Sequence, residues 1–286
     1  MVVIIMKSIL VLEGGALRGI YTAGLLDFFM DKGIRVDSLV GVSAGALFGF
    51  NYISNQRGRC IGYNLDYCDK KEYMGFHSWL TTGNIMNKET CFNEIVYKTY
   101  PVDFEAFNKS KTKFYCVVTN VETGKAEYIN IKNLEEEMEY LRASGSMPIV
   151  SKIVNINGKK YLDGAVGDSI PLKWALDNGY DRVIVVRTRY GNYRKKKSLT
   201  LPYKILYHKY PKFMNNAINR YKDYNDTLDY IENMKKDKRV LVLEPSKFIN
   251  VKRIERDKKK IKDMYDLGYE DTKNRYSEIC KFLDIE

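Results

Sequence analysis

The chain has 286 residues, of which 45% are hydrophobic and 29% are charged, a composition that excludes an intrinsically disordered protein. Five scattered cysteines without C-x-x-C spacing argue against a disulfide framework or a zinc site, and we expect a cytoplasmic protein without a metal or cofactor. The formal net charge is +11, and residues 194–286 hold most of it, with 24 Lys and Arg against 15 Asp and Glu. This basic segment predicts an anionic partner, either a lipid surface or nucleic acid, unless it is only a solvated face.

The chain opens with an apolar run, residues 4–12, that is interrupted by Lys7. It is shorter than the roughly 20 apolar residues that span a bilayer, and no A-x-A-like cleavage site follows it. We therefore predict a first buried strand and no transmembrane helix.

A glycine loop follows this strand at residues 13–19, and three interpretations of it compete. A phosphate-binding P-loop would end in G-K-[ST], which Arg18-Gly19 does not match. A dinucleotide-binding G-x-G-x-x-G is matched only in part, because Ala16 takes one glycine position, although Asp37 keeps this alternative open. The third interpretation is an oxyanion hole, in which the N–H groups of Gly14 and Gly15 face a carbonyl oxygen.

Ser43 lies in a G-x-S-x-G sequence between a predicted strand at residues 37–40 and a predicted helix at residues 44–52. Gly41 and Gly45 allow the tight turn that presents such a serine as a nucleophile at a helix N-terminus. A further predicted helix at residues 21–32, ended by Gly33, precedes this turn. The resulting βαβα order predicts a parallel sheet whose strand ends bring the glycine loop and Ser43 to one edge.

The middle of the chain alternates between irregular and regular segments. We expect residues 58–100 to be loop-rich, with short helices that cover the site. Strands at residues 114–119 and 125–130 form one predicted hairpin, and Asn157-Gly158 forms the turn of a second. A helix is predicted at residues 133–143, with the acids at 135–137 in its first turn. A helix at residues 174–178 and a core strand at 182–187 follow.

A serine nucleophile needs a base, and the chain has only two histidines. His77 precedes the acid in the wrong order for an α/β-hydrolase, and we interpret it as a structural or surface residue. His208 follows the serine and the acid in the chain, as the α/β-hydrolase order requires, but its neighbours are basic and aromatic. Asp163 ends a predicted strand and precedes Gly164, a pattern that also suits a simple turn residue. The residues alone leave His208 and Asp163 open as the base.

Three short motifs resemble the signatures of the patatin-like phospholipase family, in the family's order. They are residues 14–19 (GGALRG), residues 41–45 (GVSAG) and residues 163–165 (DGA), and the similarity extends over about residues 7–190. Residues 143–148 and 251–271 resemble the bacterial branch of the family. The resemblance implies an α/β fold with a mostly parallel central sheet flanked by helices, and hydrolysis of fatty-acyl esters of phospholipids or lysophospholipids.

The resemblance also implies roles for individual residues. Ser43 would be the nucleophile and Asp163 the base of a Ser–Asp dyad. The N–H groups of Gly14, Gly15 and Ala44 would form the oxyanion hole. Arg18 and Gly19 match positions that can bind an anion, or Arg18 only braces the loop. Ala16 departs from the family pattern, which has a glycine there.

The last third of the chain is predicted to be mainly helical, at residues 221–234, 252–267 and 272–283, with one late core strand at 239–244. We predict a catalytic domain at residues 1–190 and a basic extension at residues 191–286 that packs on the same domain. The expected partners are a lipid substrate and, transiently, an anionic membrane surface, and no nucleic acid. The alternatives are a non-catalytic module that binds lipid surfaces and a nucleotide-binding protein.

Overall fold

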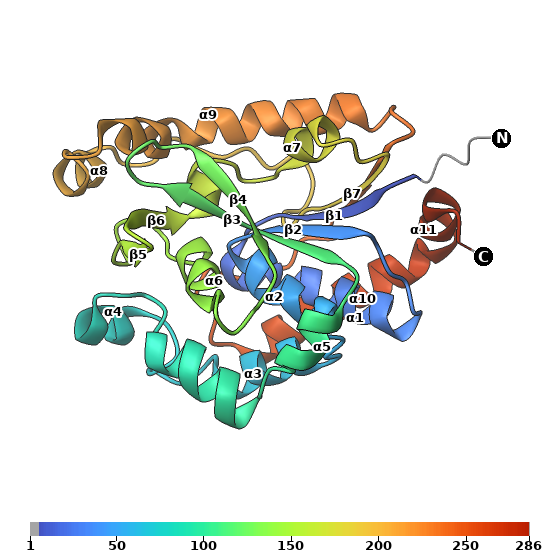
Figure 1. Ribbon diagram of the computed structural model, residues 1–286, viewed down its shortest axis with the longest axis horizontal. Helices are drawn as coiled ribbons and strands as arrows, with labels where there is room; N and C mark the ends of the chain where they lie inside the picture. The colour runs from blue at the N-terminus through green and yellow to red at the C-terminus, as the bar shows by residue number, and fades with distance from the viewer. Residues whose placement is uncertain (1–5, 286) are drawn as a thin grey trace.

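The computed structural model describes residues 6–285 and is built around one eight-stranded sheet (Figure 1). The strand order is β5-β6-β3-β2-β1-β7-β8, and β4 pairs with β3 outside this path. The strands are β1 (Ser8–Leu12), β2 (Ser38–Val42), β3 (Lys113–Asn120), β4 (Ala126–Ile131), β5 (Val154–Ile156), β6 (Lys159–Asp163), β7 (Arg182–Val186) and β8 (Val240–Leu243). Five neighbouring strands, β3, β2, β1, β7 and β8, are parallel to one another. The strands β4, β5 and β6 join the sheet through antiparallel pairs.

Helices cover both faces of the sheet. They are α1 (Ile20–Asp31), α2 (Ala44–Ile53), α3 (Arg59–Tyr67), α4 (Phe76–Thr82), α5 (Phe104–Lys109), α6 (Met138–Ser144), α7 (Leu172–Asp177), α8 (Leu201–Leu206), α9 (Pro211–Met234), α10 (Lys258–Asn274) and α11 (Tyr276–Leu283). In Figure 1, α7 and α9 lie on one face of the sheet, and α1, α2, α5 and α10 lie on the other. Short 3-10 turns η1 (Ala16–Gly19) and η3 (Gly164–Val166) and a π-helix η2 (Thr90–Thr99) complete the set.

The central strands are buried on both faces, which explains their continuous apolar sequences. Successive side chains of a strand point to opposite faces, so Leu10 and Leu12 enter the core beneath α1 and α2. Ile9 and Val11 enter the second core beneath α9. All four side chains are fully buried. The predicted α/β architecture is therefore confirmed, although residues 4 and 5 of the predicted first strand lie outside the described residues.

The two predicted hairpins and most predicted elements are present, but several predicted helices are wrong in their limits. The helix predicted at residues 133–143 begins only at Met138, because Glu137 accepts hydrogen bonds from the N–H groups of Lys132 (2.7 Å) and Asn133 (2.9 Å). These bonds close a separate turn, so the acids at 135–137 precede the helix instead of forming its first turn.

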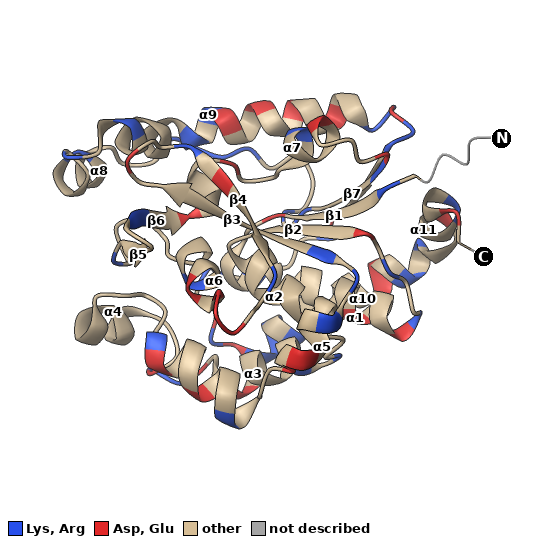
Figure 2. Ribbon diagram, in the orientation of Figure 1, with Lys and Arg blue, Asp and Glu red and all other residues tan. Residues whose placement is uncertain are grey.

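The C-terminal helices also divide at a different place from the predicted one. The α10 helix begins after Asp257, whose carboxylate accepts from the N–H groups of Lys259 (3.0 Å) and Lys260 (3.3 Å), and it continues through Gly268 to residue 274. The break falls at Arg275. The α9 helix starts at Pro211, ten residues before the prediction, because proline is well tolerated in the first turn. Acidic residues occur along α9, so this helix is not uniformly basic (Figure 2).

The α10 helix packs directly on α1, and two glycines explain how close they are. A Cβ at Gly24 would lie 2.0 Å from the Tyr265 carbonyl oxygen, and one at Gly268 would lie 2.0 Å from the Tyr21 carbonyl oxygen. Any side chain at either position would therefore collide with the backbone of the facing helix. This crossing packs the C-terminal region on α1, the helix that follows the first strand of the sheet.

None of the helices within residues 6–285 combines the length and the apolar character needed to cross a bilayer.

Candidate active site

Ser43 occupies the turn between β2 and α2 with φ 53° and ψ −121°, a positive φ that is uncommon for a residue other than glycine. Its two glycine neighbours are required by space. A Cβ at Gly41 would lie 2.6 Å from the backbone of Ala46, and one at Gly45 would lie 2.4 Å from the Leu12 carbonyl oxygen. The sequence therefore folds here into a tight strand-to-helix turn that presents the serine hydroxyl.

Asp163 lies opposite Ser43 although 120 positions separate them in the chain. The Ser43 hydroxyl donates a hydrogen bond of 2.8 Å to Asp163 Oδ2, and the Ala165 N–H donates one of 2.9 Å to Oδ1. The sheet explains the meeting, because β2 lies beside β3 and the end of β3 pairs with β6, whose last residue is Asp163. Both side chains are buried.

Burial of the Asp163 carboxyl raises its pKa above the ordinary value of an aspartic acid. The Arg220 cation, the Ala165 N–H and the Ser43 hydroxyl act in the opposite direction, since each stabilises the carboxylate. The carboxyl group is therefore in an environment that increases its affinity for a proton while it faces a serine hydroxyl.

Ser144 supports the serine turn, and the motifs did not identify it as a site residue. Its hydroxyl accepts from the Ser43 N–H (2.8 Å) and donates to the Val117 carbonyl oxygen (2.7 Å), and it is fully buried. Ser144 therefore connects the turn to β3 and holds the Ser43 backbone. The available signal was the resemblance of residues 143–148 to the bacterial branch of the family.

The glycine loop lies against Ser43. A Cβ at Gly14 would lie 2.9 Å from the Ser43 Cβ, so only glycine allows this approach. Within residues 6–285, the N–H groups of Gly14 and Gly15 donate to no protein acceptor. Ala16 has φ 49°, a conformation that glycine adopts without strain and that explains a glycine at this position of the family pattern. Gly19 packs on the start of α2.

Three other candidate residues lie away from Ser43. His208 pairs through Nδ1 with the Ile205 carbonyl oxygen (2.9 Å), and neither His208 nor His77 is among the residues that line the cavities at Ser43. Asp37 precedes β2 and binds Ser8 at the start of β1, at the opposite end of these strands from the glycine loop. An acid that binds the ribose would have to lie at the carboxyl ends of the strands, beside the glycine loop. The dinucleotide-binding alternative is therefore wrong, because it depends on Asp37.

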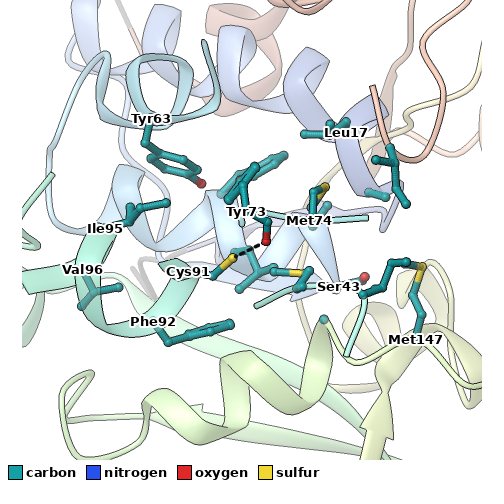
Figure 3. A pocket seen from close by; sticks show the side chains of 18 of the residues that line it. Leu17, Ser43, Tyr63, Tyr73, Met74, Cys91, Phe92, Ile95, Val96 and Met147 are labelled. Atoms are coloured by element: carbon teal, nitrogen blue, oxygen red, sulfur yellow. Dashed lines mark hydrogen bonds between the residues drawn. The ribbon is translucent and has the colours of Figure 1, made fainter. Parts of the chain in front are cut away.

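An apolar cavity that is lined mainly by hydrophobic side chains opens at Ser43. Figure 3 shows Ser43 toward one side of this cavity and Ile95 and Val96 toward the other. The segment between α2 and α5 supplies the largest share of the wall, including Tyr63 and Phe92. Such a cavity suits a hydrocarbon chain.

A second, polar cavity also reaches Ser43 and Asp163. Arg18 of the glycine loop lines it, together with basic residues from later in the chain: Arg189, Lys195, Arg220 and Arg253. Burial and the neighbouring arginines lower the pKa of Arg18 to about 10. Ser43 thus lies at the boundary between an apolar and a cationic space.

No group of three or more His, Cys, Asp or Glu side chains suited to a metal ion occurs in the part of the chain that the structure describes.

The chain matches two protein families. Residues 10–176 match the model of the patatin-like phospholipases, and residues 210–284 match a domain of unknown function (DUF6363).

Several known proteins are similar to parts of the chain. The uncharacterized protein YjjU of Escherichia coli is 30% identical over 63% of this chain and 51% of YjjU. Lysophospholipase NTE1 of Saccharomyces cerevisiae is 28% identical over 62% of this chain and 10% of NTE1. The probable lipid hydrolase 463L of Invertebrate iridescent virus 6 is 24% identical over 65% of this chain and 71% of 463L.

The matched regions thus span about half of YjjU and a tenth of NTE1. Among solved structures, VipD from Legionella pneumophila is similar at a TM-score of 0.47 and 12% identity, covering 98% of this chain and 67% of VipD. The phospholipase model alone matches more than half of the 286 residues. On this basis, the chain belongs to the patatin-like phospholipase family.

Proposed function

We propose that this protein is a serine acyl hydrolase that cleaves fatty-acyl esters of phospholipids or lysophospholipids with Ser43 as nucleophile and Asp163 as general base. The observation that carries the proposal is the 2.8 Å hydrogen bond between the Ser43 hydroxyl and Asp163 Oδ2, at the mouth of an apolar cavity. Membership of the family and the names of two relatives, a lysophospholipase and a probable lipid hydrolase, support the substrate class.

The proposed reaction has two steps. Asp163 accepts the proton as the Ser43 oxygen attacks the ester carbonyl carbon, and the carbonyl oxygen becomes an oxyanion. The N–H groups of Gly14, Gly15 and Ala44 are the proposed donors to this oxyanion, because the first two have no protein acceptor and Ala44 is the first residue of α2. The alcohol leaves with the proton, and water then attacks the acyl-serine to release the fatty acid and restore Ser43.

The test of this function is the release of fatty acid from a mixed lipid extract and from a p-nitrophenyl acyl ester by the purified protein. We expect turnover of both substrates without added metal or cofactor. A folded protein that binds liposomes but cleaves no acyl ester would instead be the non-catalytic lipid-binding module that the sequence left as an alternative.

Acid should inhibit the reaction, because only the ionised Asp163 accepts a proton. We expect kcat/KM to fall on the acid side with an apparent pKa above that of an ordinary aspartic acid, since burial raises the pKa of Asp163. The Arg220 cation lowers this pKa, so Arg220→Gln should move the acid limb to higher pH, whereas Lys197→Gln on the exposed surface should not. The measurement is a pH profile of ester hydrolysis with a pH-stat, and an unchanged limb in Arg220→Gln would contradict the assignment of the base.

We also propose that two short helices dock on an anionic membrane surface and bring the lipid to the site. In Figure 1, α4 and α8 lie at the end of the molecule away from both termini. Their exposed apolar side chains include Phe76 (67% exposed) and Leu80 (63%) on α4 and Leu201 (66%) and Ile205 (61%) on α8. Two exposed basic residues, Lys204 on α8 and Lys209 shortly after it, suit acidic headgroups.

Charged residues at these positions should weaken membrane binding. We expect the double variant Leu201→Asp and Ile205→Asp to bind vesicles of mixed acidic and zwitterionic lipid at least about tenfold more weakly, because it removes two apolar side chains worth roughly 1.5–3 kcal/mol each when buried. Ile285→Asp, at the opposite end of the molecule, is the matched control. Vesicle sedimentation measures the binding, and equal losses in both proteins would exclude this docking surface.

The cytoplasm is the compartment we propose, and five free thiols support it, because free thiols are typical of a reducing environment.

A further inference from the structure

Five basic side chains line the polar cavity beside Ser43 and Asp163. They are Arg18, Arg189, Lys195, Arg220 and Arg253. Among residues 6–285, none of the five forms an ion pair with an Asp or Glu. Arg253 is exposed, and the other four cations are half-buried. Positive charges gathered in one cavity repel one another and attract counter-ions, so a cluster of this size calls for an anionic ligand that the chain does not itself supply.

The contacts that the five cations do make are weak or neutral. Arg220 Nε lies 3.3 Å from Ser169 Oγ, the Arg189 guanidinium stacks 4.2 Å from the centre of the Tyr193 ring, and Lys195 Nζ lies 4.5 Å from the centre of the Tyr224 ring. The Arg18 Nε atom is fully buried, and no acceptor for its hydrogen occurs among residues 6–285. Most of the N–H donors of this cluster are therefore unoccupied.

Two carboxylates line the same cavity, but neutral groups already occupy them. Glu13 accepts from the Thr188 N–H (2.6 Å), the Thr188 hydroxyl (3.1 Å) and the Tyr224 hydroxyl. Asp163 accepts from the Ser43 hydroxyl and the Ala165 N–H. Five basic side chains thus face two carboxylates, and the oxygens of both carboxylates already accept hydrogen bonds from neutral donors.

The positive charges of the cluster destabilise one another. Burial, together with the Arg220, Arg253 and Arg189 cations, lowers the pKa of Lys195 to about 7, and similar causes act on Arg18. A bound anion would reverse these effects, because it would stabilise the protonated lysine and occupy the free N–H donors.

We propose that this cavity binds a phosphomonoester, the uncapped headgroup of a fatty-acyl ester whose chain fills the apolar cavity on the other side of Ser43. The identification as a headgroup rests on the proposed function. A zwitterionic headgroup adds one negative and one positive charge and leaves the excess of cations uncompensated. A phosphomonoester adds about −1.5 to −2 and three acceptor oxygens, which suits several guanidinium groups at once.

The proposal also assigns a role to the C-terminal region. Four of the five cations follow residue 176, where the match to the phospholipase family ends, and Arg220 and Arg253 belong to the matched domain of unknown function. Arg220 is on α9, and Arg253 lies in the segment before α10. This domain therefore completes the substrate cavity and selects the headgroup.

Hydrolysis of three substrates with one acyl chain tests the selectivity: acylglycerol 3-phosphate, acylglycerophosphocholine and monoacylglycerol. We expect the phosphomonoester to have the highest kcat/KM. In Arg189→Gln and Arg253→Gln, the ratio of kcat/KM for the phosphomonoester to that for monoacylglycerol should fall about tenfold or more, because each loses a hydrogen bond between charged groups. Lys197→Gln, an equal change of charge on the exposed part of the same loop, should keep the ratio.

Binding separates this inference from the proposed function. Glycerol 3-phosphate and inorganic phosphate are titrated by calorimetry into the folded Ser43→Ala protein, and both should bind. Binding should be lost when Arg189→Gln or Arg253→Gln is added to this variant.

Tighter binding of glycerol 3-phosphate would identify a headgroup site, and equal binding would identify a site for free phosphate and overturn the headgroup assignment. Ester hydrolysis with equal use of all three substrates and no phosphate binding would overturn the inference and leave the hydrolase. Phosphate binding without hydrolysis of any ester would support the anion site and overturn the hydrolase.

Discussion

Replacing Ser43 by Ala or Asp163 by Asn is expected to lower kcat for a p-nitrophenyl acyl ester by about 10⁴-fold or more. The magnitude is typical of removing the nucleophile or its base from a hydrolase, where only binding and oxyanion stabilisation remain. In Ser43→Ala the atom that attacks the ester is absent. In Asp163→Asn the shape is preserved, but the amide cannot accept the serine proton.

Two matched controls make this result specific. Asp168→Asn changes a half-buried aspartate only five residues away, whose Oδ2 accepts from the Tyr128 hydroxyl at 2.7 Å and which lines neither cavity at Ser43. His208→Ala removes the histidine that a conventional triad would require. We expect both control proteins to retain activity within a few-fold. An inactive His208→Ala protein together with an active Asp163→Asn protein would show that the base is misassigned.

The second large effect is expected at the crossing of α1 and α10. Gly24→Ala and Gly268→Ala each place a Cβ 2.0 Å from a backbone carbonyl oxygen of the facing helix, so the helices must move apart. We expect each to lower the free energy of unfolding by about 2–3 kcal/mol, because the overpacking outweighs the gain of about 1 kcal/mol in helix propensity. For a chain of this length, the midpoint of thermal unfolding should fall by roughly 5–10 °C.

A third glycine provides the control for this experiment. A Cβ at Gly49 in α2 would meet only side-chain methyl groups of Leu39 and Leu12, which can adjust, so Gly49→Ala should change stability by about 1 kcal/mol or less. The double variant Gly24→Ala with Gly268→Ala should lose less than the sum of the single effects, since one collision already separates the helices. Wild-type stability of Gly268→Ala would show that α10 is not packed on α1 as described.

This crossing also bears on domain organisation. We propose that residues 191–286 pack on the catalytic domain, and β8 supports this because it pairs with β7 at the edge of the same sheet. Denaturation by urea should then follow a single transition that both glycine variants shift. Two separate unfolding transitions, of which the glycine variants shift only the second, would indicate an independent C-terminal unit.

Much of the site could be predicted because its parts are local. The turn at Ser43 requires glycine on both sides within three residues, and the glycine loop directly follows β1. Both are thus at the carboxyl ends of neighbouring parallel strands, a position that the βαβα order already implies. Ala16 departs from the family pattern, and its positive φ explains why the family has glycine at this position.

Other parts of the site have no local signature. The apolar residues Tyr63 and Phe92 follow a helical pattern that is the same for an ordinary core and for the wall of a cavity. Arg220 and Arg253 belong to the basic excess of residues 194–286, but a count of charges does not show whether they gather at one place. Ser144 contacts Ser43 only because α6 packs beneath the serine turn.

The sequence alone determined which short turns this chain can form, because glycine, serine and aspartate have conformational and chemical properties that act within a few residues. Only the tertiary structure decided that β6 pairs with the end of β3 and places Asp163 beside Ser43, and that five cations from four separate segments share one cavity. The physical reason is that strand pairing and charge clustering join residues far apart in the chain, and their energies depend on distances in space.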